Sequence, residues 1–272
     1  MRNIEVAVLN ESHMSPGGMM LFLAKLTQRG HKIHNMKELK GLYASSVYAL
    51  QDERIKTSTI AHMANLPHGT IKRFTPITVA IVGASRRFLA QARTHQVGMN
   101  YVSASLQYSD YSGQADFVVP YALIEAAKRD NIDYVQEYLD DCTRAMESYS
   151  GIAKLTDNDT AGYAAPQGLR NILIMQANHE AWMYFISLRG CNRNTTETQY
   201  VTMRIWEELL KTADGEEMFQ YAGPECTFGM CKEGKMCCGN SLKNFVDTAH
   251  TMNVSIPRLI IDTKWPLLKE EK

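Results

Sequence analysis

The stretch that decides the fold runs from Gly83 to Tyr108 and reads GASRRFLAQARTHQVGMNYVSASLQY. The segment before it, Thr70 to Val82, mixes polar and apolar residues in a way that predicts a half-buried β-strand. Gly83 interrupts this segment, and Ser85 is of a residue type that commonly caps helix N-termini. A strand followed directly by a helix is therefore expected here.

The helix expected after Ser85 carries four polar side chains: Arg86, Gln91, Arg93 and His95. Gln91 and His95 are four positions apart, which places them on one face of a helix. After His95 the periodicity is lost and glycine, asparagine and serines predict a loop. A strand, a polar helix and a loop rich in small residues together form a suitable site for an anionic ligand.

The spacing G-x-S-R-x4-Q-x3-H in this stretch resembles the signature of flavin-dependent thymidylate synthases. Members of that family carry an Arg-His-Arg triplet and then a loop with Ser-x-Arg-Tyr. In this chain the triplet position reads Thr94-His95-Gln96. The loop ends Ser105-Leu106-Gln107-Tyr108, with one extra residue relative to the family pattern.

A second part of the resemblance lies between Pro166 and Gln199. The family pattern has a proline, an asparagine twelve residues later, an arginine eleven further and then a glutamine; Pro166, Asn178, Arg189 and Gln199 fit it. Asn178 and Arg189 are eleven residues apart, which is close to three turns of a helix, so both can face one cavity. The alternative for Arg189 is an arginine that stabilises a helix C-terminus.

The resemblance implies an α+β fold with a central, mostly antiparallel sheet flanked by long helices. It also implies transfer of a one-carbon unit from methylenetetrahydrofolate to dUMP, with FAD as cofactor and NADPH as reductant. The family's sites form between subunits of a homotetramer, so a homotetramer is expected here. Two alternatives stay open: a dUMP or dCMP hydroxymethylase, and a paralogue that binds flavin or pyrimidine nucleotide without catalysis.

Residue roles follow from the resemblance. The implied cofactor-binding residues are His68, Thr70, His95, Gln96 and Asn178. The implied substrate-binding residues are Gln91, Ser103 and Gln107. The implied catalytic residues are Arg189 and Ser105, although no base for a serine nucleophile is identifiable beside Ser105. His68 has an alternative interpretation as a solvent-facing histidine in a turn.

Five arginines of the family pattern are replaced here, at Thr94, Gln96, Gln107, Gly162 and Glu180. Losing two charge-assisted hydrogen bonds to phosphate costs about 3–6 kcal/mol, or roughly two to four orders of magnitude in affinity. These losses favour the non-catalytic alternative, whereas the retained Asn178 and Arg189 favour an enzyme. Nearby arginines that could compensate are Arg86, Arg93 and Arg170.

Five of the six cysteines lie late in the chain. The stretch 223–239, GPECTFGMCKEGKMCCG, resembles the tail of clostridial-type family members, which also carry Cys-Asn-Arg after the site arginine, here Cys191-Asn192-Arg193. The resemblance and the crowding of thiols imply a structural zinc site. The predicted ligands are Cys191, Cys226, Cys231 and Cys238. The alternative is a turn-rich lid of reduced thiols that binds no metal.

Length and composition predict one main domain over 1–222 and a cysteine-rich appendage over 223–272. The formal net charge is zero, which gives no reason to expect nucleic-acid binding. Apolar runs are too short for a membrane span, and the first residues turn acidic too early for a signal peptide. A cytoplasmic protein without membrane or nucleic-acid partners is therefore expected.

Other elements are expected from periodicity and from capping residues. Strands are predicted over 4–9 and 115–119. Helices are predicted over 16–29, from about 37 to 65, over 120–150, over 166–188 and over 195–211.

Overall fold

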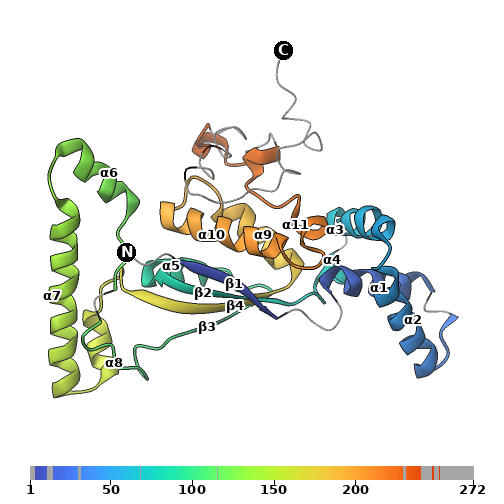
Figure 1. Ribbon diagram of the computed structural model, residues 1–272, viewed down its shortest axis with the longest axis horizontal. Helices are drawn as coiled ribbons and strands as arrows, with labels where there is room; N and C mark the ends of the chain where they lie inside the picture. The colour runs from blue at the N-terminus through green and yellow to red at the C-terminus, as the bar shows by residue number, and fades with distance from the viewer. Residues whose placement is uncertain are drawn as a thin grey trace, which may run out of the picture.

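The computed structural model describes residues 4–10, 15–29, 32–67, 69–114, 116–228, 231–239, 247 and 251. Its sheet has four antiparallel strands in the order β1-β2-β4-β3. The strands are β1 (Glu5–Asn10), β2 (Ile77–Ser85), β3 (Met99–Ser103) and β4 (Arg170–Ala177). The expected α+β fold with an antiparallel sheet and flanking helices is confirmed (Figure 1).

Three groups of helices surround this sheet (Figure 1). One group lies at one end: α1 (Pro16–Arg29), α2 (Met36–Ala49), a π-helical turn (Ile55–Ile60), α3 (Ala61–Asn65) and α4 (Gly69–Lys72). A second projects as an arm: α6 (Tyr121–Asp130), α7 (Tyr134–Leu155), α8 (Asn158–Ala161) and a 3-10 turn (Gly162–Ala164). The third is α5 (Arg86–Ala92), α9 (His179–Arg189), α10 (Thr196–Leu210) and α11 (Gly215–Phe219), followed by 3-10 turns at Glu225–Phe228 and Gly234–Met236.

The main core lies between the sheet and α9 and α10. Alternate residues of β2 and β4 are buried, as the period of a strand with one covered face requires. Trp182 of α9 is fully buried, and its Nε1 donates to the carbonyl of Ile77 at 3.3 Å. A second, smaller core holds the arm: Phe117, Cys142, Met146, Tyr149, Ala161 and Leu169. The helices that carry polar site residues are therefore fixed to the sheet from one side.

Several local predictions are confirmed. Ser85 caps α5, because its hydroxyl accepts the N–H of Phe88 at 3.1 Å. The first strand and α1 lie where the sequence predicts them. The helix predicted over 195–211 is α10, and Thr195 caps it by accepting the N–H of Thr198 at 3.2 Å.

The largest error is the long helix predicted over 166–188. Its first half is β4, which pairs with β2 on one side and β3 on the other, and α9 begins only after Asn178. Tertiary pairing of this strand overrides its local helical pattern. The strand predicted over 70–82 is also too long at its start, since 69–72 form α4 and β2 begins at Ile77.

Three smaller differences concern turns. The helix predicted over 120–150 is two helices, because Asn131 takes a left-handed conformation (φ 53°) and ends α6. The helix after Ser85 ends at Ala92, so His95 lies beyond it, and the expected loop contains β3. The strand predicted over 115–119 is a single bridge between Phe117 and Leu169, and Ala115 lies outside the described residues.

Two further predictions concern membrane spans and the division of the chain into domains. None of the helices described above is both long and apolar enough to cross a lipid bilayer. The boundary between a main domain over 1–222 and an appendage over 223–272 stays a prediction, because much of the second segment lies outside the described residues.

Gly83 provides a test of the β2–α5 junction. Its φ is +91°, and a Cβ there would lie 1.9 Å from Arg170 Nη2. Gly83→Ala is expected to lower the free energy of unfolding by about 2 kcal/mol or more, because strain and a steric clash add. Gly41→Ala is the matched control, since nothing lies within 4 Å of its Cβ position on α2, and a gain of up to about 1 kcal/mol is expected. Chemical denaturation of both variants measures the difference, and equal stabilities would contradict it.

Candidate active site

Arg189, the last residue of α9, lies at the centre of a hydrogen-bonded group. Its Nε donates to His95 Nε2 at 2.8 Å, and its Nη2 donates to Thr94 Oγ1 at 2.7 Å. Its Nη1 donates to Asn194 Oδ1 at 3.0 Å. All three acceptors are neutral, so in the described part of the chain no carboxylate is bonded to this guanidinium. Its positive charge stays available for an anionic ligand.

His95 is a neutral hydrogen-bond acceptor in this group. The residue is 9% exposed, and its ring packs edge-on against Phe185, with centroids 5.0 Å apart. Burial, together with the charge of Arg189, lowers the pKa of His95 to about 4. Because Nε2 accepts from Arg189, the proton of the neutral ring is on Nδ1. His95 therefore orients Arg189 and is not charged near neutral pH.

Gln91 is in contact with α10. Its Oε1 accepts the hydroxyl of Thr198 at 2.7 Å. This predicted substrate-binding residue thus links α5 to the helix that follows Arg189. Thr198 was not predicted as a contact, because nothing in its spacing relates it to Gln91, 107 positions earlier. Asn194 was not predicted either, although it lies only five positions after Arg189.

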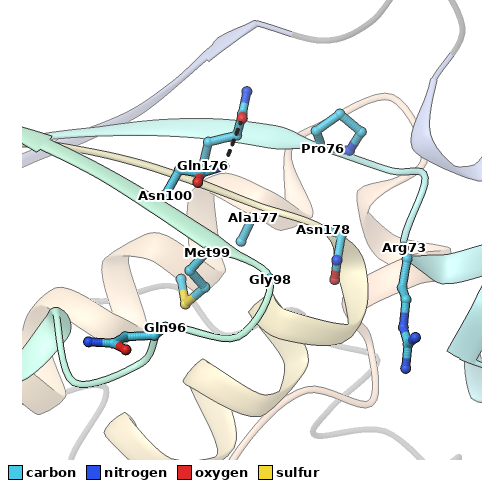
Figure 2. A pocket seen from close by; sticks show the side chains of 9 residues that line it. All are labelled: Arg73, Pro76, Gln96, Gly98, Met99, Asn100, Gln176, Ala177 and Asn178. Atoms are coloured by element: carbon cyan, nitrogen blue, oxygen red, sulfur yellow. Dashed lines mark hydrogen bonds between the residues drawn. The ribbon is translucent and has the colours of Figure 1, made fainter.

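A cavity of about 310 Å³ opens beside Asn178 (Figure 2). The residues that line it are Arg73, Pro76, Gln96, Gly98, Met99, Asn100, Gln176, Ala177 and Asn178. It brings together two predicted cofactor-binding residues, Gln96 and Asn178, that are 82 positions apart in the sequence (178 − 96). The Oδ1 atom of Asn178 caps α9 by accepting the N–H of Ala181 at 2.9 Å. Gly98 (φ +74°) permits the close approach, since a Cβ there would lie 3.1 Å from Asn178 Nδ2.

Three polar residues of this cavity were not predicted from sequence: Arg73, Asn100 and Gln176. Asn100 of β3 and Gln176 of β4 are direct cross-strand partners, and their amides meet at 3.4 Å. Strand β3 lies in a segment predicted to be loop, and β4 lies in a segment predicted to be helix. Nothing in the sequence therefore indicated this pair. Arg73 forms a salt bridge with Glu180 at 2.9 Å, which places a cation beside a position where the family pattern has arginine.

Other predicted residues lie elsewhere on the surface. Ser103 accepts a hydrogen bond from Arg93 Nη2 at 2.5 Å, and Gln107 is exposed. The hydroxyl of Ser105 accepts the backbone N–H groups of Gln107 at 3.1 Å and Tyr108 at 3.3 Å. Ser105 therefore stabilises a turn. The last two predicted site residues are Thr70, which is exposed on α4, and His68, which lies outside the described residues.

The late cysteines lie near one another. Burial and the nearby thiols of Cys191, Cys238 and Cys231 raise the pKa of Cys226 to about 11. Arg193 links the segment after α9 to the cysteine-rich segment, since its Nε donates to the carbonyl of Met236 at 2.7 Å. Within the described ranges, however, no three histidine, cysteine or acidic side chains are arranged to hold one metal ion.

Residues 12–213 match the sequence model of the family described as thymidylate synthase complementing protein. The chain belongs to this family. A flavin-dependent thymidylate synthase of Geobacter sulfurreducens is 26% identical over 242 residues, covering 88% of this chain and 95% of that protein. One of Clostridium tetani is 24% identical over 181 residues, covering 60% and 69% of the two chains.

Solved structures of the same fold are similar to the present one. Thymidylate synthase X of Helicobacter pylori, determined with FAD and dUMP, has a TM-score of 0.58 at 16% identity, covering 80% of this chain and 98% of that one. A UMP/dUMP methylase of Streptomyces cacaoi, bound with 5-Br dUMP, has a TM-score of 0.58 at 15% identity, covering 82% and 97%. These comparisons confirm the family expected from the motifs at 83–108 and 166–199 and the fold expected with it.

The neutral state of His95 leads to a pH dependence of stability. The pKa values of His95 and buried His179 are lowered from 6.5 to about 4 in the folded protein, chiefly by burial. As the pH falls, the unfolded chain takes up these protons first, so stability is complete above about pH 6.5 and is lost toward pH 4. Chemical denaturation from pH 8 to pH 4 should show this loss, and His95→Gln should reduce it. A His95 ring resonance that titrates near pH 6.5 would contradict the assignment.

Proposed function

We propose that this protein transfers a one-carbon unit from methylenetetrahydrofolate to dUMP, with FAD as cofactor and NADPH as reductant. The observation that supports it best is the group formed by Arg189, His95 and Thr94, which joins the two sequence motifs of the family in one place. The named relatives and their bound ligands support the same activity.

Arg189 provides the charge that the reaction needs. The pyrimidine carbon has to become nucleophilic to attack the one-carbon unit, so negative charge develops on the ring, and a guanidinium held in advance stabilises that charge. Its orientation is fixed by neutral His95 and by Asn194, so no carboxylate in the described structure competes with the substrate for it. In this proposal Gln91, Ser103 and Gln107 contact the nucleotide, and Ser105 holds the turn that positions Gln107.

The cavity beside Asn178 fits part of a flavin. Its polar lining of amides and one guanidinium suits the hydrogen-bonding edge of an isoalloxazine ring, which as a bound cofactor would supply the electrons for reduction. In this proposal Asn178, Gln96 and Arg73 hold the ring, while Thr70 and His68 lie on the preceding segment. At about 310 Å³ the cavity is at the lower end for ligand pockets, so the rest of FAD needs further surface. A homotetramer, whose neighbouring subunits provide that surface, is part of the proposal, as is a cytoplasmic location.

A second candidate is a changed substrate or a non-catalytic paralogue. The observation that favours it is the salt bridge between Glu180 and Arg73, which neutralises a cation beside the cavity. Arginines of the family pattern are also absent at positions 94, 96, 107 and 162. Hydroxymethylation of dUMP or dCMP belongs to this alternative.

Purified protein tests the proposal directly. The proposed enzyme is expected to be yellow, to be bleached by NADPH, and to release tritium from labelled dUMP when methylenetetrahydrofolate is added. Arg189→Ala should lower turnover by at least about 100-fold, as loss of a preorganised charge does at other sites. The control is Arg144→Ala, an exposed arginine on α7 that pairs with Asp141 and should keep full turnover when it is replaced.

Three results would contradict parts of the proposal. A colourless protein that takes up no added FAD would support the non-catalytic paralogue. Tritium release with a product heavier than dTMP would support hydroxymethylation. Unchanged turnover of the Arg189→Ala tetramer would remove Arg189 from the mechanism.

The zinc site is a separate part of the proposal. Its support is the set of reduced thiols, together with the backbone N–H of Arg193, which is directed at Cys191 Sγ at 3.5 Å. Such hydrogen bonds stabilise a thiolate. Because no three thiols are arranged as ligands among the residues described, the segment has to tighten around the ion.

Metal analysis tests this site. One zinc ion per chain is expected in the wild type, and a chelator is expected to lower the melting temperature. Cys226→Ser should remove the zinc, whereas Cys142→Ser, which changes the cysteine inside α7, should retain it. Less than about half an equivalent of zinc in the wild-type protein would contradict the site.

A further inference from the structure

One of the three groups that accept hydrogen bonds from Arg189 belongs to the α9–α10 linker (190–195), which connects the two helices. Asn194 Oδ1 accepts from Arg189 Nη1 at 3.0 Å. Its Nδ2 donates to the backbone carbonyls of Leu188 at 2.7 Å and Cys191 at 3.1 Å. Both ends of this amide are thus used, and reversing it would turn its two donors toward a guanidinium that only donates. The acceptor is therefore fixed in place before a ligand arrives.

The α9–α10 linker completes the orientation of Arg189. A guanidinium has five N–H groups in one plane. His95 and Thr94 accept from Nε and Nη2, which lie on one edge of that plane. Asn194 accepts from Nη1 on the other side. Among the residues that the structure describes, one N–H on Nη1 and one on Nη2 are left without an acceptor. Asn194 therefore determines which two N–H groups remain for a ligand.

The linker is held at its first residue, Gly190. Gln199 of α10 is 5% exposed, and its Nε2 donates to the carbonyl of Gly190 at 3.1 Å and to Asn192 Oδ1. A Cβ at Gly190 would lie 2.8 Å from the carbonyl of Ile186 and 3.4 Å from the ring carbons of Pro224. A residue without a side chain is therefore needed here, and the chain leaves α9 in one fixed direction.

The linker is also attached to the cysteine-rich segment, which is here residues 223–239. Arg193 is exposed, and its Nε donates to the carbonyl of Met236 at 2.7 Å. Its Nη2 donates to the carbonyl of Cys237 at 3.1 Å. Arg193 and Asn194 are consecutive, so one side chain binds the cysteine-rich segment while the next binds the guanidinium. The linker therefore connects the cysteine-rich segment to the site.

Small shifts of the linker matter at the guanidinium. A hydrogen bond weakens steeply once its distance or angle leaves the normal range. Because Asn194 directly follows Arg193, release of the bonds from Arg193 lets the acceptor of Arg189 shift. A misplacement of about 1 Å at a reacting group costs roughly 100-fold in rate. Loss of contact with the cysteine-rich segment is therefore expected to disturb Arg189.

We propose that the α9–α10 linker positions Arg189, with Asn194 fixing the guanidinium and Arg193 fixing the linker to the cysteine-rich segment. Asn194 and Arg193 are positioning residues, because they act through Arg189 and not on a ligand. The inference rests on the proposed function for the reaction that Arg189 serves. It adds a regulatory contact to that function, since any change that displaces the cysteine-rich segment lowers activity without occupying the site.

A double-mutant cycle tests whether Asn194 acts through Arg189. Asn194→Ala is expected to lower turnover roughly 10-fold to 100-fold, as misplacement of a reacting group does. In the Arg189→Ala background the same change should cause no further loss, because the group that it positions is absent. Asn65→Ala is the matched control: it removes a bond to the carbonyl of Ala61 at 2.7 Å on α3 and should keep full turnover. Losses that multiply in the double variant would overturn the proposal.

A second variant tests the attachment of the cysteine-rich segment. Arg193→Ala changes an exposed residue and is expected to lower turnover roughly 2-fold to 30-fold, the usual range for a residue that couples two sites. Lys232→Ala is the control, because this lysine of the same segment pairs with Glu225 at 2.8 Å and should not change turnover. Unchanged turnover of Arg193→Ala would overturn the role of the segment.

Chemical modification tests the linker without reference to catalysis. Phenylglyoxal modifies arginines, and peptide mapping by mass spectrometry gives the rate at each one. Asn194→Ala should speed modification of Arg189 roughly 2-fold to 10-fold, the value of one hydrogen bond, while exposed Arg144 serves as internal control. An inactive wild type with this faster modification in the variant would overturn the proposed function and support the linker. An active wild type with equal rates would overturn the linker and leave the proposed function intact.

Discussion

The pairing of β2 with β4 is the constraint on which the rest of the structure depends. These two central strands are about ninety residues apart in the chain and pair from Ile77 to Ser85, with one irregularity between Val82 and Ala84. The first is followed by α5 and the second by α9, so their pairing places the ends of both helices side by side. The bond from Arg189 to His95, 94 positions apart, is a direct consequence. A slip of this register by one residue would exchange buried and exposed faces and separate the two motifs.

The site could be predicted from the sequence better than the elements that form it. The cap at Ser85 was predicted correctly because a cap is a local interaction, whereas Asn178, which caps α9, lies inside the helix predicted over 166–188. The helix predicted at the position of β4 is wrong because the pairing of this strand with β2 and β3 is not encoded in any local pattern. The Asn100–Gln176 pair was missed for the same reason. The motif spacing nevertheless identified Gln96 and Asn178, which line one cavity, because the motifs carry family information about tertiary structure.

The electrostatics of the site differ from what the family pattern predicts. Thr94 and Gln96 replace charged residues on either side of His95, and Thr94 now accepts a hydrogen bond from Arg189. An arginine at position 94 would repel Arg189 and could not accept that bond. Threonine in place of arginine at position 94 therefore removes one cation and fixes the orientation of another, Arg189. The loss of the positive charge at position 94 therefore improves the orientation of Arg189, whose charge is retained.

The predicted site residues form three adjoining groups that meet in the segment 93–96. Arg93 contacts Ser103, Thr94 and His95 contact Arg189, and Gln96 lines the cavity beside Asn178. Because these four residues are consecutive, the groups lie next to one another at the end of α5. The arm formed by α6 and α7 stands away from the sheet in Figure 1 and has a second core of its own. The arm is therefore stabilised by apolar contacts that are separate from those of the main core.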